Sequence, residues 1–315
     1  MHVDYLRHML VVQNLTYAYT SSESFELDVP EWECPEGGRV AIVGKSGSGK
    51  TTFLKCLAGL LQPDSGMIRW KDERVKGADE RLVPGNDRIK LVHQDFGQDP
   101  HMKVVENLRK YILQHDDEAR ADRIQKWLNE LAIEELGSRK TVQLSGGQLQ
   151  RVALAQTLLA EPEVMLMDEP FSNLDPIHKQ EFIPSLRRLF DRESTTLISV
   201  MHDPMDALQM AERVVVFSDG KILEEGTPEE LLNAPKFLET VRLFGAVNVL
   251  PEAEYTALFG EPAVHPTIDG FRWFRPNEMK LDNLVKDYHL IRRLPMPGET
   301  WLELEVDETI LVVSE

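Results

Sequence analysis

The hydrophobic residues in about the first three quarters of the chain lie in short runs that lack polar–apolar alternation. Four runs are predicted as strands, at residues 40–43, 164–167, 196–200 and 214–217. Strands buried on both faces of a parallel sheet have this pattern, whereas half-exposed strands alternate. Apolar residues at helical spacing lie between these runs, at residues 51–61, 148–159 and 179–190. The alternation of strands and helices predicts an α/β fold with a mostly parallel sheet.

Two regions depart from this alternation. From about residue 98 to residue 160 the pattern is mostly helical, including a helix at 120–131, which predicts a helical subdomain inserted into the sheet domain. Past about residue 245 the chain has short β-like runs separated by proline and glycine, at residues 271–274, 288–292, 301–306 and 310–313. We therefore expect one domain over residues 1–240 and a small all-β domain over residues 241–315.

Composition narrows the function classes. The chain has 315 residues, and its 53 acidic against 35 basic residues give a formal net charge of -18, which argues against nucleic acid as a partner. Cys34 and Cys56 lack the paired spacing of a zinc site. Charges interrupt every apolar run before the ~20 residues needed to cross a bilayer. The first ten residues lack the pattern of a secretory signal, so we expect the chain in the cytoplasm.

A glycine-rich segment follows the first predicted strand and precedes a predicted helix, which is the context of a phosphate-binding loop. Its backbone N–H groups and the helix N-terminus suit phosphate oxygens. Lys50 is expected to neutralise the β- and γ-phosphates of ATP, and the Thr51 hydroxyl to bind Mg²⁺. The candidate ATP-binding residues of this segment are Gly44, Lys45, Ser46, Gly47, Ser48, Gly49, Lys50, Thr51 and Thr52.

Two carboxylates end the predicted strand at residues 164–167. Ligands of open α/β sheets gather at the carboxyl ends of the strands. Asp168 is therefore a candidate Mg²⁺ ligand, and Glu169 a candidate to orient or deprotonate an attacking water.

The segment Leu-Ser-Gly-Gly-Gln at residues 144–148 resembles the signature of ATP-binding cassette (ABC) ATPases. Its serine and glycines suit a helix N-terminus, which is also an anion site. In that family the signature binds the γ-phosphate of ATP held by the other subunit, so the resemblance implies a head-to-tail homodimer. The signature residues, acting on the partner's ATP, are Ser145, Gly146, Gly147 and Gln148.

Other positions match the family in order along residues 3–240. Tyr19 resembles the aromatic residue that stacks on adenine, and Gln94 resembles the Q-loop glutamine, which binds ATP and Mg²⁺. Asp175 resembles the D-loop aspartate and His202 the switch histidine. The resemblance thus implies a phosphate-loop NTPase cassette whose catalytic residues are Lys50, Glu169 and His202.

The chain departs from the family at two positions. Gln156 stands where relatives often have arginine, and Met201 where threonine commonly precedes the histidine. Neither change removes a catalytic group, so a working ATPase is expected.

The segments at residues 168–176 and 223–231 look most like ATPases that energise importers. Residues 270–281 and the final strand pair resemble the small oligonucleotide-binding-like barrel called TOBE. The resemblance implies import of an ion or small solute, separate transmembrane permease subunits gripped around residues 94–108, a solute-binding protein, and a location on the inner face of the cell membrane. An exporter ATPase and a soluble cassette protein acting on DNA or the ribosome are the alternatives.

Overall fold

The computed structural model describes residues 9–19, 25–92, 98–112, 116–172, 174–260, 265–280, 283–284, 286–306 and 309–314. The chain forms two compact units, Met1–Glu225 and Gly226–Glu315.

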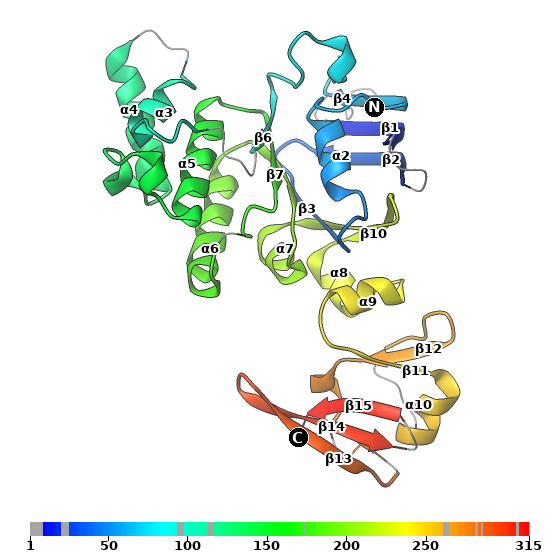
Figure 1. Cartoon of the computed structure of the whole chain (residues 1–315). Helices are drawn as coiled ribbons and strands as arrows, with labels where there is room; N and C mark the ends of the chain where they lie inside the picture. The colour runs from blue at the N-terminus through cyan, green and yellow to red at the C-terminus, as the bar shows by residue number, and fades with distance from the viewer. Residues whose placement is uncertain are drawn as a thin grey trace. The chain divides into compact units, whose positions relative to one another are not determined.

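A mostly parallel sheet organises the first unit (Figure 1). β3 runs parallel to β8 and β9, and β7 runs parallel to β6 and β8. The α/β fold predicted from the continuous apolar runs is therefore confirmed, because β3, β7, β8 and β9 contain the four predicted strands. In spatial order the strands are β10 (Lys221–Gly226), β9 (Arg213–Ser218), β3 (Arg39–Gly44), β8 (Thr196–Val200), β7 (Val164–Asp168) and β6 (Ile89–Val92).

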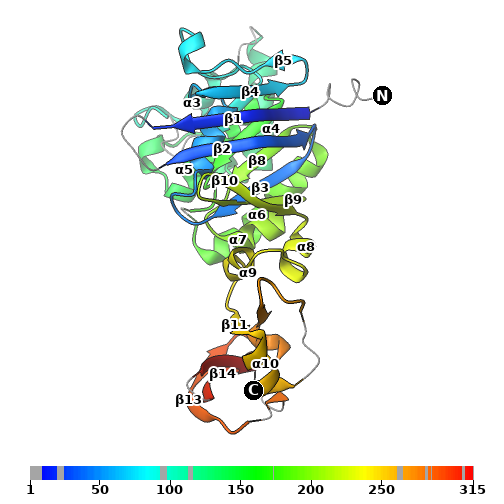
Figure 2. The same cartoon turned by 90° about the vertical axis from the view of Figure 1, so that its right-hand side faces the viewer.

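A second, antiparallel sheet of the first unit was not predicted from the sequence. In Figure 2 its strands β1, β2 and β4 lie side by side as one layer. Its strands, in spatial order, are β2 (Glu26–Pro35), β1 (Met9–Ala18), β4 (Ser65–Trp70) and β5 (Glu73–Arg74).

In the first unit α2, α6 and α7 each follow a strand, whereas α3, α4 and α5 lie in the long segment between β6 and β7. These last three helices fall in the interval predicted as a helical subdomain. The helices are α2 (Lys50–Leu57), α3 (Val104–Arg109), α4 (Asp117–Glu130), α5 (Gly146–Leu159), α6 (Pro176–Arg192) and α7 (Pro204–Met210), with short 3₁₀ turns η2 (Ala78–Glu80), η3 (Glu134–Leu136) and η4 (Thr141–Gln143). No helix in the described part of the chain is long and apolar enough to span a membrane.

The core of the first unit fixes the position of α2. Phe53 of α2 is fully buried, and its ring lies 5.4 Å from Trp32 of β2 and 5.3 Å from Phe217 of β9, measured between centroids. Cys34 and Cys56 are buried free thiols, and burial raises the pKa of each to about 12. Because aromatic rings from both sheets pack on one helix, the loop that joins β3 to α2 is held at both ends.

The second unit is built from antiparallel strands and short helices. The predicted β strands of residues 241–315 are confirmed, since the described strands form two antiparallel sheets, β11–β12 and β13–β14–β15. The prediction that this region is all-β is wrong, because a helix at Glu252–Phe259 lies between β11 and β12. Closure of the strands into a barrel remains a prediction. Its elements are α8 (Pro228–Asn233), α9 (Leu238–Leu243), β11 (Asn248–Pro251), α10 (Glu252–Phe259), β12 (Phe271–Phe274), η5 (Pro276–Glu278), β13 (His289–Met296), β14 (Glu299–Val306) and β15 (Thr309–Ser314).

One side chain joins the two sheets of the second unit. The amide of Asn248 on β11 donates to the Val312 carbonyl at 2.7 Å and accepts from the Val312 N–H at 2.8 Å. Beside this contact, Phe274 and Leu304 are fully buried in a common apolar cluster. The Asn248 amide therefore satisfies backbone groups of β15 that a neighbouring strand would otherwise satisfy.

Candidate functional site

The loop at residues 44–49 connects β3 to α2. A Cβ at Gly44, whose φ is 149°, would lie 2.2 Å from the Phe217 carbonyl oxygen, so no larger residue fits there. Gly49 is the N-cap of α2 and has φ 102°, a conformation that side chains disfavour. Lys45, Ser46 and Gly47 are exposed at the outer part of the loop. The glycines thus let the backbone curl before a helix N-terminus, which is the geometry that binds phosphate.

Lys50 lies at the centre of this loop. Its ammonium donates to the carbonyls of Gly44 at 2.9 Å and Lys45 at 2.7 Å, and it lies 3.5 Å from the hydroxyl of Ser48, which is also buried. Burial lowers the pKa of Lys50, although the carboxylates of Glu169 and Asp168 act in the opposite direction. A buried ammonium whose hydrogen bonds go to neutral carbonyl and hydroxyl oxygens is suited to bind an anion.

Thr51 meets the carboxylate at the end of β7. Its hydroxyl donates to Asp168 Oδ1 at 3.1 Å, although 117 positions separate the two residues in the sequence. Burial raises the pKa of Asp168, and the neighbouring Glu169 raises it further, while Thr51, Lys55 and Lys50 lower it. The carboxyl ends of β3 and β7 therefore bring together the two predicted Mg²⁺ ligands that lie among the described residues.

These two oxygens fit Mg²⁺, since that ion prefers hydroxyl and carboxylate oxygens and keeps several waters and substrate phosphates. No group of three or more histidine, cysteine, aspartate or glutamate side chains that would hold a metal by itself occurs among the described residues. Gln94, the third predicted Mg²⁺ ligand and a predicted ATP contact, lies outside the part of the chain that the structure describes.

Glu169 occupies a strained position directly after β7. Its φ is 49°, which is uncommon for a residue with a side chain, and its carbonyl accepts hydrogen bonds from the N–H and hydroxyl of Ser172. His202 is exposed after the neighbouring strand β8, and Met201 before it is buried and donates to the Ile42 carbonyl at 2.9 Å. Glu169 and His202 line one cavity of about 310 Å³, so the structure brings these two predicted residues together.

Aromatic side chains lie beside the start of α2. The Tyr19 hydroxyl is 3.1 Å from the hydroxyl of Thr52, and Tyr19 as a residue is 38% exposed, so it is accessible beside the loop. Phe25 packs 6.1 Å from Tyr19 between centroids, and a Cβ at Gly49 would lie 3.0 Å from its ring. Phe25 could not be predicted from the sequence, because a lone phenylalanine before a strand that was itself unpredicted carries no recognisable signal.

The signature residues form the N-terminus of α5. The Ser145 hydroxyl accepts from the Gln148 N–H at 3.4 Å, and the Gln148 side chain accepts from the Ser145 N–H at 3.1 Å, which is a capping box. Ser145 and Gly146 are exposed, and Gly147 and Gln148 are partly buried. Figure 1 draws α5 well apart from α2, so the chain does not bring its own signature to its own phosphate loop.

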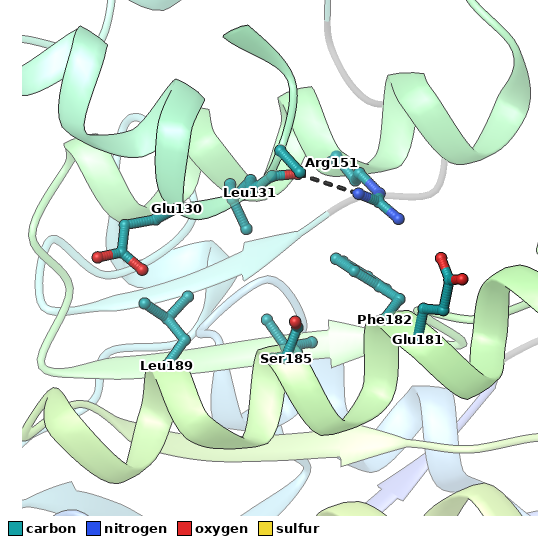
Figure 3. A pocket seen from close by; sticks show the side chains of 9 residues that line it. Glu130, Leu131, Arg151, Glu181, Phe182, Ser185 and Leu189 are labelled. Atoms are coloured by element: carbon teal, nitrogen blue, oxygen red, sulfur yellow. Dashed lines mark hydrogen bonds between the residues drawn. The ribbon is translucent and has the colours of Figure 1, made fainter.

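Arg151, one turn further along α5, connects three helices (Figure 3). Its guanidinium donates to the Leu131 carbonyl at the end of α4 at 3.1 Å and lies 4.6 Å from the ring centroid of Phe182 on α6. Burial lowers the pKa of Arg151, against the opposite effect of Glu181. These contacts border a cavity of about 150 Å³, so α5 is held to α6 by a cation–π contact beside a space that side chains do not fill.

Asp175 and Gln156 hold their helices in place. The Asp175 carboxylate caps α6, accepting from the N–H groups of Ile177 and His178 at 3.1 Å, and it lies 2.5 Å from the His178 ring, whose hydrogen bond lowers the pKa of Asp175. Gln156 is buried in α5 and lies 3.5 Å from the Gln98 side chain. The departure at Gln156 is therefore a packing position of the helical segment.

Comparisons with known proteins agree with this geometry. A family model described as ABC transporter matches residues 27–172. The sulfate/thiosulfate import ATP-binding protein CysA of Synechocystis sp. is 38% identical over 237 residues, which are 74% of this chain and 65% of that protein. The Fe(3+) ions import ATP-binding protein FbpC of Rhizobium etli is 39% identical over 220 residues, 68% of this chain and 60% of that protein. The chain thus spans between 60% and 65% of the length of these two relatives.

This chain spans a larger share of a third relative, and a solved cassette structure has a similar fold. The CysA protein of Bacillus cereus is 34% identical over 273 residues, 79% of this chain and 73% of that protein. The ATP-binding cassette MJ0796, in a dimeric post-hydrolysis state bound to ADP and Pi, matches with a TM-score of 0.60 and 29% identity over 70% of this chain and 98% of that chain. The chain therefore belongs to the ABC transporter family, in which it is similar to the ATP-binding proteins of importers.

Proposed function

We propose that this protein is the ATP-hydrolysing subunit of an ABC importer. The observation that carries the proposal is the meeting of the Lys50 loop, the Thr51–Asp168 contact and Glu169 at the carboxyl ends of β3 and β7. An anion-binding loop, hard oxygen ligands and a carboxylate beside them are the groups that phosphoryl transfer from a nucleotide requires.

Each residue has a role in the proposed reaction. The loop at residues 44–52 holds the phosphates, with Lys50 neutralising the charge on the β- and γ-phosphates, and Tyr19 stacks on adenine. Thr51, Asp168 and Gln94 would hold Mg²⁺, which would supply positive charge that neutralises the phosphates. Glu169 orients or deprotonates the attacking water, and His202, which lines the same cavity, is the switch histidine beside it. Because little covalent chemistry falls to the protein, positioning and charge neutralisation supply the acceleration.

The active unit in this proposal is a homodimer. The exposed capped N-terminus of α5 supports it, because Ser145 through Gln148 present an anion site to the solvent away from the chain's own loop. In the proposed dimer the D-loop residue Asp175, which is the exposed N-cap of α6, would also lie in this interface. A similar cassette has a dimeric post-hydrolysis structure.

The transported solute is proposed to be an inorganic ion. The relatives reported above are import proteins for sulfate/thiosulfate and for Fe(3+) ions, which favours an importer over an exporter and over a cassette that acts on DNA or the ribosome. Separate permease subunits and a solute-binding protein would complete the transporter and hold the chain at the cytoplasmic face of the membrane.

An open groove supports the proposed permease contact near residues 94–108. Val105, Leu128 and Gly137 are among the residues that line this groove of about 810 Å³ on the helical segment. We further propose that residues 241–315 form a TOBE-like domain that performs no chemistry.

The proposal is tested by the Lys50→Ala variant. Loss of the buried ammonium should reduce ATP hydrolysis by ~100-fold or more, because phosphate charge would no longer be neutralised inside the loop. Lys221→Ala is the matched control, since the ammonium of Lys221 is exposed and pairs with Asp28 at 3.3 Å. Phosphate release is measured for both folded variants. Equal activity of wild type and Lys50→Ala would refute the assignment.

A further inference from the structure

An ion pair connects the two helices that follow the site. Lys179 Nζ on α6 donates to Asp206 Oδ2 on α7 at 2.8 Å. The Asp206 side chain is 10% exposed and the Lys179 side chain 22% exposed. Both residues line the cavity of about 310 Å³ that Glu169 and His202 also line.

Short backbone links join this pair to the loops of the site. The Lys179 N–H donates to the Asp175 carbonyl at 3.0 Å, in the first turn of α6. The Asp206 N–H donates to the Asp203 carbonyl at 3.1 Å, and Asp203, which follows His202, caps α7 through the Met205 N–H at 2.9 Å. The ion pair therefore closes a connection between the loop after β7 and the loop after β8.

We propose that the Lys179–Asp206 ion pair is a positioning element that sets the separation of Glu169 and His202, and with it the turnover of bound ATP rather than the affinity for ATP. This inference rests on the proposed ATPase function. Neither residue contacts the loop that would hold the phosphates, so both are positioning residues and not catalytic ones.

Two features of the ion pair explain its effect on turnover: it is partly buried, and it lies close to the loops that carry Glu169 and His202. A partly buried pair has a fixed geometry, and removal of one partner leaves the other charge without compensation in a poorly solvated place. Each charge lies within one helical turn of a site loop, so a small rotation of α7 against α6 would change the position of His202. Displacements of about 1 Å reduce catalysis by up to ~100-fold when groups must be aligned.

The test compares steady-state ATPase kinetics of full-length variants. Lys179→Met should lower kcat by ~10-fold or more with KM for ATP within about twofold of wild type, because the phosphate loop is untouched. Lys179→Arg, which keeps the charge, should retain most of the activity. The exchanged pair, Lys179→Asp with Asp206→Lys, should recover part of the loss and keeps the test available if Lys179→Met does not fold.

Arg187→Met is the matched control. Arg187 on α6 also contacts α7, because its guanidinium donates to the Gln209 carbonyl at 3.1 Å. Gln209 lies near the end of α7 that is far from His202. The kcat of the Arg187→Met variant should equal that of wild type. Equal kcat for Lys179→Met and Arg187→Met, a loss that appears only as a raised KM, or no recovery in the exchanged pair would overturn the inference.

Failure of the proposed function has a different signature. In that case wild type and Lys50→Ala would hydrolyse ATP equally, and both the function and the inference would be refuted. An ATPase that depends on Lys50 but is indifferent to Lys179 refutes the inference alone.

Discussion

The backbone N–H of Glu169 donates a hydrogen bond to the carbonyl of Val200 at 2.9 Å. Glu169 is the first residue after β7, and Val200 is the last residue of β8, two positions before His202. The two loops that carry the proposed water-activating carboxylate and the proposed switch histidine therefore start from one fixed point at the carboxyl ends of β7 and β8.

Glu169→Gln should keep this backbone hydrogen bond and bind ATP, but lower hydrolysis by ~100-fold or more, because an amide cannot take a proton from water. With ATP and Mg²⁺ the variant should accumulate as a dimer on size-exclusion chromatography. Wild type under the same conditions serves as the comparison. A Glu169→Gln protein that binds ATP yet stays monomeric would contradict the shared active site.

Asp168→Asn should raise the free energy of unfolding at pH 7.5 while abolishing Mg²⁺-dependent activity. Burial raises the pKa of Asp168 above its ordinary value of 3.8, so the folded chain binds the proton more tightly than the unfolded chain. Ionisation above the folded-state pKa therefore costs stability, and the amide removes that cost. The gain should shrink as pH falls toward the folded-state pKa. Urea unfolding at several pH values between 5 and 8 measures it.

Asp175→Asn provides a control of opposite sign. The hydrogen bond to His178 lowers the pKa of Asp175, so its carboxylate contributes stability above the unfolded pKa, and the substitution should not stabilise the protein at pH 7.5. Equal responses of the two variants would show that the carboxylate of Asp168 is not penalised by burial.

Arg151→Met should lower the free energy of unfolding by about 1–2 kcal/mol, because the cation–π contact with Phe182 and the hydrogen bond to Leu131 are both lost. Chemical denaturation measures the difference. Arg188→Met is the control, since the Arg188 side chain is exposed on α6 and donates to Ser185 of its own helix at 3.3 Å. If both variants unfold alike, the link between α5 and α6 contributes no stability.

A chain shortened to residues 1–245 should hydrolyse ATP with the turnover per dimer of the full chain. The candidate phosphate, metal and water-activating groups all precede residue 226, where the second compact unit begins. The rate per subunit is measured against protein concentration, since occupancy of a shared site follows mass action. A shortened chain that folds, binds ATP and dimerises yet is inactive at every concentration would place a catalytic group in the removed segment.

The parallel sheet could be predicted because strands buried on both faces leave continuous apolar runs. The antiparallel sheet could not. In β1 the pairing with β4 shifts between Gln13 and Thr16, and Asn14 has φ 47°, which breaks the expected alternation. β2 contains Pro30, which argues against a strand in sequence but is tolerated at the sheet edge where β2 lies.

The residues of the candidate site also differ in whether the sequence predicts them. Lys50, Thr51 and Asp168 lie in motifs whose spacing alone indicates phosphate and metal chemistry, and the structure brings them together. The pairing of Lys179 with Asp206 depends on how α6 packs on α7, and no local pattern indicates it. The position of Gln94 is outside the described residues, so its role stays a prediction.

The left-handed backbone of Glu169 has an evolutionary consequence. A residue with a Cβ costs roughly 1 kcal/mol more than glycine in this conformation, so mutation and selection for stability alone would drift toward glycine at this position. Chains designed or selected only for thermal tolerance should therefore lose this glutamate early. Its retention in a natural variant of this fold would be a sign that selection still acts on turnover.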